Sequence, residues 1–202
     1  MRERRPLATT GHWLQRLVRL DLDVFRDVAG DTAATLPMLA LVTAASFLSG
    51  VGSWLWWLFQ SRQAAGEVFL KSCLLGGLLQ VPVWLLWVYV AYQTLTLAFG
   101  VRVEFYALVR AMGLAFAPMA LTVLMAVAQL AVPLAVIPLA ATVLLSLVAV
   151  EAASDAEPGQ ALLATLSGFA AFALVMGILA NIAEVEGVGG VAPGLFFFAL
   201  DF

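Results

Sequence analysis

Apolar residues fill five long stretches of this chain, and short polar or charged segments separate these stretches. A helix rises about 1.5 Å per residue, so each stretch is long enough to cross about 30 Å of hydrocarbon. The pattern therefore predicts an all-α, polytopic bundle of about five transmembrane helices. We place the first three helices at about residues 36–59, 72–99 and 104–132. The fourth follows a short turn bracketed by Pro133 and Pro138 and ends near residue 150, and the fifth covers about residues 161–180.

A shorter amphipathic pattern precedes the first apolar stretch. Such a pattern is typical of a helix that lies on the membrane surface. Asp21 should end this helix and cap a second short one, because its carboxylate can accept orphan backbone N–H groups. The apolar side of the first helix carries Trp13, Leu14, Leu17 and Val18, and its polar side carries Arg16 and Arg19.

The third apolar stretch carries one arginine, one glycine and one proline in that order. Arg110 lies near the start of the span, so its stem can follow apolar surface while the guanidinium reaches the headgroups. Gly113 and Ala117 are four residues apart and predict a notch for a neighbouring helix. Pro118 predicts a kink because it lacks a backbone N–H. One apolar helix face is expected at Phe105, Leu108, Val109, Met112 and Phe116.

Small and aromatic residues mark two further features of the spans. Small residues allow two helices to approach closely within a membrane. We expect such packing at Gly50 and Gly52 and at the pair Gly76 and Gly77. Tryptophans gather at membrane–water interfaces, so an aromatic belt is expected near the end of the first span. Its members are Trp54, Trp56 and Trp57, and Trp13, Arg16 and Arg19 are the interface residues of the amino-terminal segment.

Composition supports a membrane protein. The chain is 63% hydrophobic and 11% charged, and its mean hydropathy is +1.02. A soluble domain of this length could not bury so much apolar surface. The first apolar run begins after about thirty residues and is too long for a signal peptide, so we expect it to remain in the protein.

Basic residues predict the orientation. Six arginines precede the first span, and a cytoplasmic amino terminus also places Arg102 and Arg110 inside. Only Arg62 and Lys71 then lie outside, as the positive-inside rule favours. We therefore expect a multi-pass protein of the bacterial cytoplasmic membrane. We divide it into residues 1–30, a cytoplasmic amphipathic segment; 31–180, the transmembrane domain; and 181–202, an interfacial tail.

The chemical inventory argues against an enzyme. His12 is the only histidine and Cys73 the only cysteine, so no catalytic Ser–His pair inside the bilayer and no Cys/His zinc cluster is expected. The predicted spans carry essentially no ionisable residue near their centres, where a coupled transporter needs one. We expect no cofactor, no metal and no nucleic-acid partner. The expected partners are the bilayer, other integral membrane subunits and bound lipids.

Residues 106–118, Y-A-L-V-R-A-M-G-L-A-F-A-P, resemble the bacterial branch of the Yip1-domain family. Members typically show a tyrosine, a short apolar run, an arginine, a glycine and then Ala-Pro. The corresponding positions here are Tyr106, Arg110, Gly113, Ala117 and Pro118.

The resemblance covers about residues 17–176. It includes a pre-membrane segment at 19–25, a second-span segment at 84–92 and a loop at 149–155. Glu151 stands where the family often has arginine, and Leu22 where it often has proline, so a cationic role of that loop does not carry over. Eukaryotic Yip1-type proteins act in membrane trafficking with small GTPases, whereas the resemblance here is to the bacterial branch.

These observations predict a non-enzymatic membrane protein that acts by helix–helix contact. Packing without polar chemistry fits a scaffold or accessory subunit of a larger membrane complex. The alternative is an uncoupled transporter or channel-like protein, because Pro82, Pro118 and Pro138 could break helices around a cavity.

Overall fold

The computed structural model describes residues 6–60 and 65–183. Every regular element in these residues is helical, and five helical segments are long and apolar enough to cross a membrane. The all-α polytopic bundle is therefore confirmed. The predicted tail lies outside the described residues beyond Ala183. The spans are Thr32–Phe59, Gly66–Ala98, Phe105–Ala126, Ala131–Ala153 and Pro158–Ala180.

Two short helices, α1 (Pro6–Val18) and α2 (Val24–Gly30), precede the spans. The 3₁₀ turn η1 (Thr32–Ala34) leads into the first span, where the carboxylate of Asp31 accepts a 3.0 Å hydrogen bond from the N–H of Ala33. The remaining elements are α3 (Thr35–Gln60), α4 (Ala65–Phe69), η2 (Leu70–Gly76), α5 (Gly77–Gln93), η3 (Thr94–Ala98), α6 (Phe105–Ala115), η4 (Ala117–Ala126), η5 (Ala128–Leu130), α7 (Ala131–Ala153) and α8 (Pro158–Ala183).

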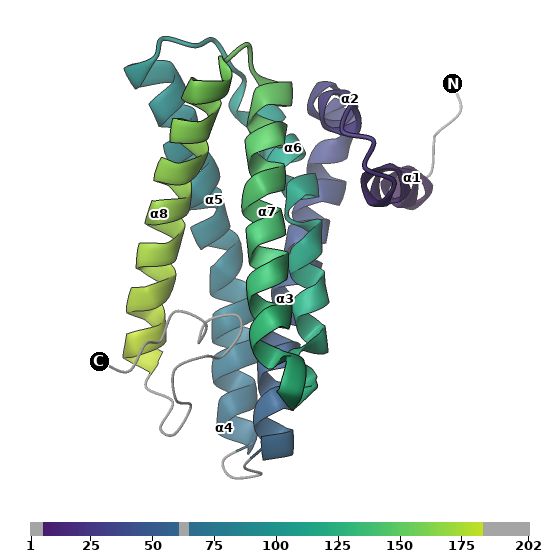
Figure 1. Cartoon of the computed structure of the whole chain (residues 1–202), viewed down its shortest axis with the longest axis vertical. Helices are drawn as coiled ribbons and strands as arrows, with labels where there is room; N and C mark the ends of the chain where they lie inside the picture. The colour runs from purple at the N-terminus through teal and green to yellow at the C-terminus, as the bar shows by residue number, and fades with distance from the viewer. Residues whose placement is uncertain (1–5, 61–64, 184–202) are drawn as a thin grey trace.

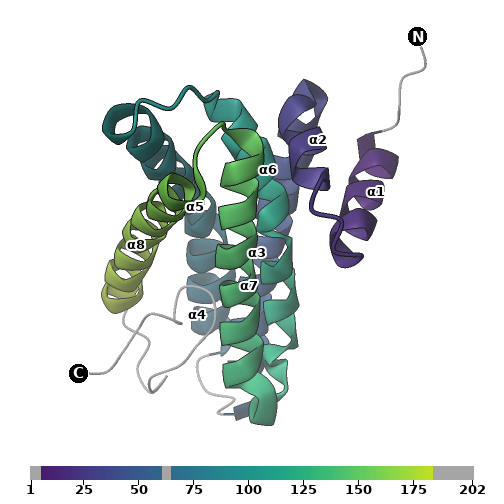
Figure 2. The same cartoon turned by 45° about the horizontal axis from the view of Figure 1, so that its top comes forward.

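Consecutive spans run in opposite directions (Figure 1). The start of α3, the α5–α6 connection and the α7–α8 connection therefore lie at one end of the bundle, which we call the amino-terminal end. Helices α1 and α2 also lie at this end (Figures 1 and 2). α1 is viewed nearly along its axis while the spans stand upright, so α1 lies across the direction of the spans (Figure 1).

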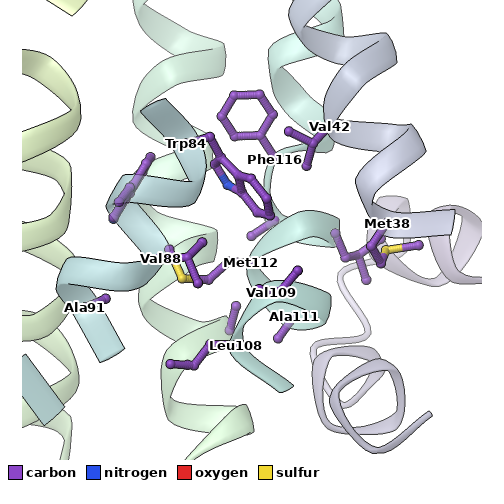
Figure 3. Packing of buried hydrophobic residues seen from close by; sticks show 14 of the residues in the cluster. Met38, Val42, Trp84, Val88, Ala91, Leu108, Val109, Ala111, Met112 and Phe116 are labelled. Atoms are coloured by element: carbon purple, nitrogen blue, oxygen red, sulfur yellow. The ribbon is translucent and has the colours of Figure 1, made fainter. Parts of the chain in front are cut away.

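Helix α6 lies at the centre of the packing. Residues 107–116 are all buried, so the helix contacts other parts of the protein on every side. Figure 3 shows its side chains between Met38 and Val42 of α3 and Trp84 and Val88 of α5. The predicted apolar face is buried, except that Phe105 is half-buried, and the other sides of the helix are buried as well. The sequence is apolar around most of this helix, which is typical of a central rather than a peripheral helix.

The second and third spans depart from regular α-helix. The second span begins earlier than predicted, with α4, and contains π-helical hydrogen bonding at η2 and η3. The third span leaves α-helical geometry before Pro118, and the ten-residue 3₁₀ segment η4 follows. Proline cannot donate to the preceding turn, which explains the change at this residue. Long 3₁₀ and π stretches are uncommon and often lie at functional sites.

Two predicted boundaries were wrong. The connection before α7 lies at residues 127–130, because the extended ψ of Val127, 99°, interrupts the helical path. Pro133 falls in the first turn of α7 and Pro138 lies inside it, so they do not bracket a turn. Membrane helices tolerate such prolines where neighbours satisfy the freed carbonyls. Glu151 lies in the last turn of α7 instead of in a loop.

Candidate functional site

Arg110 joins the amino-terminal helices to the bundle. Its Nε and Nη2 atoms donate hydrogen bonds of 2.9 and 2.6 Å to the carbonyl oxygen of Ala29, in the last turn of α2. Nη1 lies 3.4 Å from the hydroxyl of Thr35, and Nη2 lies 3.5 Å from a carboxylate oxygen of Glu104. These two contacts are long, so the carbonyl of Ala29 is the principal partner.

This geometry corrects the prediction that Arg110 reaches the headgroups. The residue is only 2% exposed, and its guanidinium points into the protein. The last carbonyls of a helix lack partners within the helix, and the helix dipole makes this end attractive to a cation. Arg110 therefore satisfies an α2 carbonyl and neutralises the end of the helix at the same time.

Two glycines place α3 directly against its neighbours. A Cβ atom added at Gly50 would lie 2.9 Å from the Cα atom of Cys73 in η2. One added at Gly52 would lie 2.5 Å from the carbonyl oxygen of Thr122 in η4. Residues two positions apart in a helix point to nearly opposite sides. α3 is therefore held on two sides by main-chain contact, as its small residues predicted.

The other predicted packing positions vary in how closely they contact a neighbour. A Cβ atom added at Gly113 would lie 2.9 Å from the Cβ atom of Met38, so the predicted notch receives α3. At Gly77 the corresponding distance to the Cα atom of Phe47 is 3.3 Å. Gly76 is buried, whereas Ala117 and Pro118 are half-buried.

The closest contact between α5 and α8 was missed by the sequence analysis. A Cβ atom added at Gly168 would meet the indole of Trp87 and would lie 2.5 Å from its carbonyl oxygen. Nε1 of Trp87 donates a 3.0 Å hydrogen bond to the carbonyl of Thr165. The hydroxyls of Thr94 and Ser167 lie 2.9 Å apart nearby. The small residues at 167 and 168 were the available signal, and they lie on the inner face of α8.

Of the three predicted amino-terminal interface residues, Trp13 and Arg16 differ from expectation. Trp13 is buried against the protein, and Arg19 is exposed. Arg16 forms ion pairs with Asp21 at 2.6 Å and with Asp27 at 2.5 Å. The hydrogen bond from Arg16 lowers the pKa of Asp21 below its ordinary value. The N-cap of α2 is Asp23, without a side-chain cap hydrogen bond, so the prediction that Asp21 caps α2 was wrong.

The aromatic positions divide between core and surface. Trp57 is buried, which corrects its assignment to an interfacial belt, and Trp54 and Trp56 are half-buried. Trp54 packs edge-on against Phe69, with ring centroids 5.2 Å apart. Tyr106 is 57% exposed, so this position of the family motif lies on the outside of the central helix.

A polar face of α3 packs against the second span. Ser46, Ser49 and Ser53 recur at helical spacing with Gly50 and are all buried. In the described part of the protein, the hydroxyls of Ser46 and Ser49 have no hydrogen-bond partner. The same holds for the hydroxyl of Ser72 and for Oε1 of Gln80 across the interface. Serine spacing was the signal that could have identified this face.

The described residues offer little reactive chemistry. Within residues 6–60 and 65–183, no group of three or more His, Cys, Asp or Glu side chains could hold a metal ion. His12 is exposed on α1, and Cys73 is buried in η2. Comparison with protein-family models, with curated proteins and with solved structures found no match to this chain. The arrangement described here is therefore the basis for a functional proposal.

Proposed function

We propose that this protein is a non-enzymatic, multi-pass membrane protein that acts by helix–helix contact, as a scaffold or accessory subunit of a larger membrane complex. The main-chain contacts of α3 at Gly50 and Gly52 carry this proposal. Close contact on two opposite sides of a helix favours a rigid body over a structure that opens around a solute. The resemblance of residues 106–118 to bacterial Yip1-domain proteins agrees with such a role.

The outer face of α8 is the surface on which we expect a partner helix. Exposed apolar side chains recur at every fourth position of α8 and form a ridge that is inclined to the helix axis, of the kind that helix–helix packing uses. In α8, only 28% of the most apolar 18-residue stretch is buried inside the protein. The buried share of the corresponding stretch in the third span is 67%. The ridge consists of Leu162, Leu166, Ala170, Leu174, Ile178 and Ile182.

Extraction of native membranes in mild detergent tests the scaffold proposal. The purified protein should run on a native gel as a discrete large complex, whose subunits mass spectrometry identifies in fixed ratios. Replacement of Leu166 and Leu174 by alanine should release these subunits while the chain stays folded. The matched control replaces Leu144 and Val136, which are exposed on α7. A band that contains this chain alone would contradict the proposal.

A channel or uncoupled transporter is the second candidate. The π-helical segment η2 and the 3₁₀ segment η4 both contact α3, and the serine face carries polar atoms without partners. Irregular backbone and buried polar groups are typical of membrane conduits. Purified protein in liposomes would then carry ions or small solutes, and Gln80→Leu would reduce the flux. A lack of flux across several solutes would favour the scaffold.

We further propose that the protein lies in a bacterial cytoplasmic membrane with its amino terminus in the cytoplasm. Five arginines of the described residues belong to α1, α2, the α5–α6 connection and α6, whereas Lys71 follows α4, which lies at the opposite end of the bundle from α1 and α2 (Figure 1). This distribution agrees with the positive-inside rule. The five arginines are Arg16, Arg19, Arg26, Arg102 and Arg110.

A further inference from the structure

Helix α1 presents two of its sides to the protein. Trp13 and Leu17, one turn apart, are buried against the bundle. Arg16 lies on a second side and pairs with Asp27 of α2. In Figure 1, α2 lies nearer the amino-terminal end of the molecule than α1. The Arg16 side of α1 therefore faces away from the middle of the spans.

Val18 lies on the side of α1 opposite to Arg16. Successive residues of a helix are about 100° apart, so a separation of two residues corresponds to about 200°. Since the Arg16 side chain reaches α2, Val18 lies on the side of α1 that is turned away from this contact. Val18 is 83% exposed, so the protein itself does not cover it.

The turn after α1 holds a leucine where glycine is the usual residue. The N–H of Leu20 donates to the carbonyl of Leu17 at 2.9 Å, and the N–H of Asp21 donates to that of Arg16 at 3.1 Å. These two bonds define a Schellman motif, whose C′ residue adopts a left-handed conformation. Leu20 has a φ of +58°, a left-handed conformation that is strained for a residue with a side chain. Its side chain is nevertheless 76% exposed, so packing within the protein does not offset this strain.

The first span fixes the level of this turn relative to the bilayer. Leu36 is the second residue of α3, belongs to the first membrane span and is 76% exposed. α1 packs against both α3 and η1, so the helix lies next to the first span and to the turn that leads into it. A surface that continues from the lipid-facing side of a span meets lipid.

We propose that Val18 and Leu20 form a lipid anchor that inserts into the boundary between headgroups and acyl chains. Arg19 lies between them in sequence and is exposed, so its guanidinium can bind lipid phosphate while its stem follows apolar surface. The bilayer is the occupant of this surface. Trp13 and Leu17, which the amphipathic pattern assigned to the membrane, instead dock α1 onto the protein. The inference depends on the membrane spans and is independent of the scaffold proposal.

Spin labels on the full chain in phosphatidylcholine nanodiscs test the anchor. Single cysteines replace Val18, Leu20 or Leu36 in a Cys73→Ala background, and accessibility is measured to oxygen and to a water-soluble nickel chelate. The matched control is His12→Cys, which is exposed one turn before Arg16 on the same helix. The ratio of oxygen accessibility to nickel-chelate accessibility should be several-fold higher at positions 18 and 20 than at position 12. It should be similar to the ratio at position 36. Equal ratios at 12, 18 and 20 would overturn the anchor.

Leu20→Gly separates anchoring from a structural role. Glycine accepts the positive φ, so the detergent-solubilised protein should be as stable as the parent or more stable. In nanodiscs, the ratio at position 18 should fall several-fold because the turn loses its inserted side chain. An unchanged ratio at 18 would contradict the anchor. Dipolar broadening between labels at position 20 in nanodiscs would instead identify a second copy of the chain as the occupant and would also overturn it.

Discussion

The guanidinium of Arg110 holds the carbonyl of Ala29, a residue 81 positions earlier in the chain. One side chain thereby connects the central helix of the bundle to the last turn of a pre-membrane helix. Arginine suits this position because its planar fork can direct two donors at one oxygen, which a lysine ammonium on a flexible stem does less well. The bond therefore adds a polar contact to the apolar packing of Val24, Phe25 and Val28 that holds α2 on the bundle.

Arg110→Lys should loosen α2. We expect a loss of about 2 kcal/mol, since hydrogen bonds to charged groups contribute about 1.5–3 kcal/mol each. Amide hydrogen exchange over residues 24–30 should accelerate in the variant, while exchange in α8 stays unchanged. Arg102→Lys serves as the matched control because Arg102 is exposed in the α5–α6 connection. Equal exchange in the two variants would show that α2 docks without Arg110.

Gly113→Leu should separate α6 from α3. The new Cβ would lie 2.9 Å from that of Met38, and both atoms are fixed by backbone. Overpacking of this kind typically costs about 1–3 kcal/mol, so the melting temperature in detergent should fall. Gly66→Ala is the control because nothing lies within 4 Å of its added Cβ. If both variants melted like the parent, Gly113 would not be a packing notch.

Gly168→Ala should disrupt the interface between α5 and α8. The added methyl group meets the carbonyl and indole of Trp87, so the hydrogen bond from Nε1 to Thr165 should lengthen or break. The indole N–H resonance of Trp87 would then shift and exchange faster with solvent. Gly159→Ala, in the first turn of the same helix, has open space around its added Cβ and should leave that resonance in place. An unshifted signal in both would refute the contact.

Acid should loosen α1. Arg16 holds the pKa of Asp21 below its ordinary value of 3.8, and a carboxyl with a lowered folded pKa stabilises the fold only while it is ionised. Its contribution is therefore present above about pH 4 and disappears as the pH falls through the lowered pKa. Hydrogen exchange in α1, corrected for intrinsic rates, should rise below that range. Asp21→Asn should show the faster exchange already at pH 6, and a parent-like rate there would contradict the ion pair.

Cysteine labelling can test the orientation. Asp155→Cys in the α7–α8 connection should resist a membrane-impermeant maleimide added outside intact cells, whereas Glu67→Cys near the opposite end should react. A reporter fused to the carboxyl terminus should accordingly be active only outside the cytoplasm. A cytoplasmic reporter would show that the number of spans differs by one from that proposed.

The spans were predictable because hydrophobic length is a local property. α3 matches its predicted range within one residue at each end. The positions at which the helices break were harder to predict, because the positions of prolines in the sequence do not show whether neighbouring residues satisfy the freed carbonyls. Pro118 lies where α-helical geometry ends, whereas Pro138 lies within a continuous α7.

The site residues show the same division between local and long-range information. Gly50, Gly52 and Gly113 were identified as small residues, but only the fold shows that all three contacts involve α3. Arg110 lies near a membrane edge in sequence, where an arginine ordinarily reaches water. Its partner at Ala29 is a backbone carbonyl, which no sequence pattern marks.

The bond between Arg110 and Ala29 also sets an order of events during synthesis. The ribosome synthesises α2 and the first two spans before residue 110 has been made. Proteins are generally synthesised from the amino terminus at about 5–20 residues per second. The last turn of α2 therefore lacks the guanidinium of Arg110 until the third helix has been made and has entered the membrane. A chain that stalls after the second span would leave the carbonyl of Ala29 without its guanidinium partner.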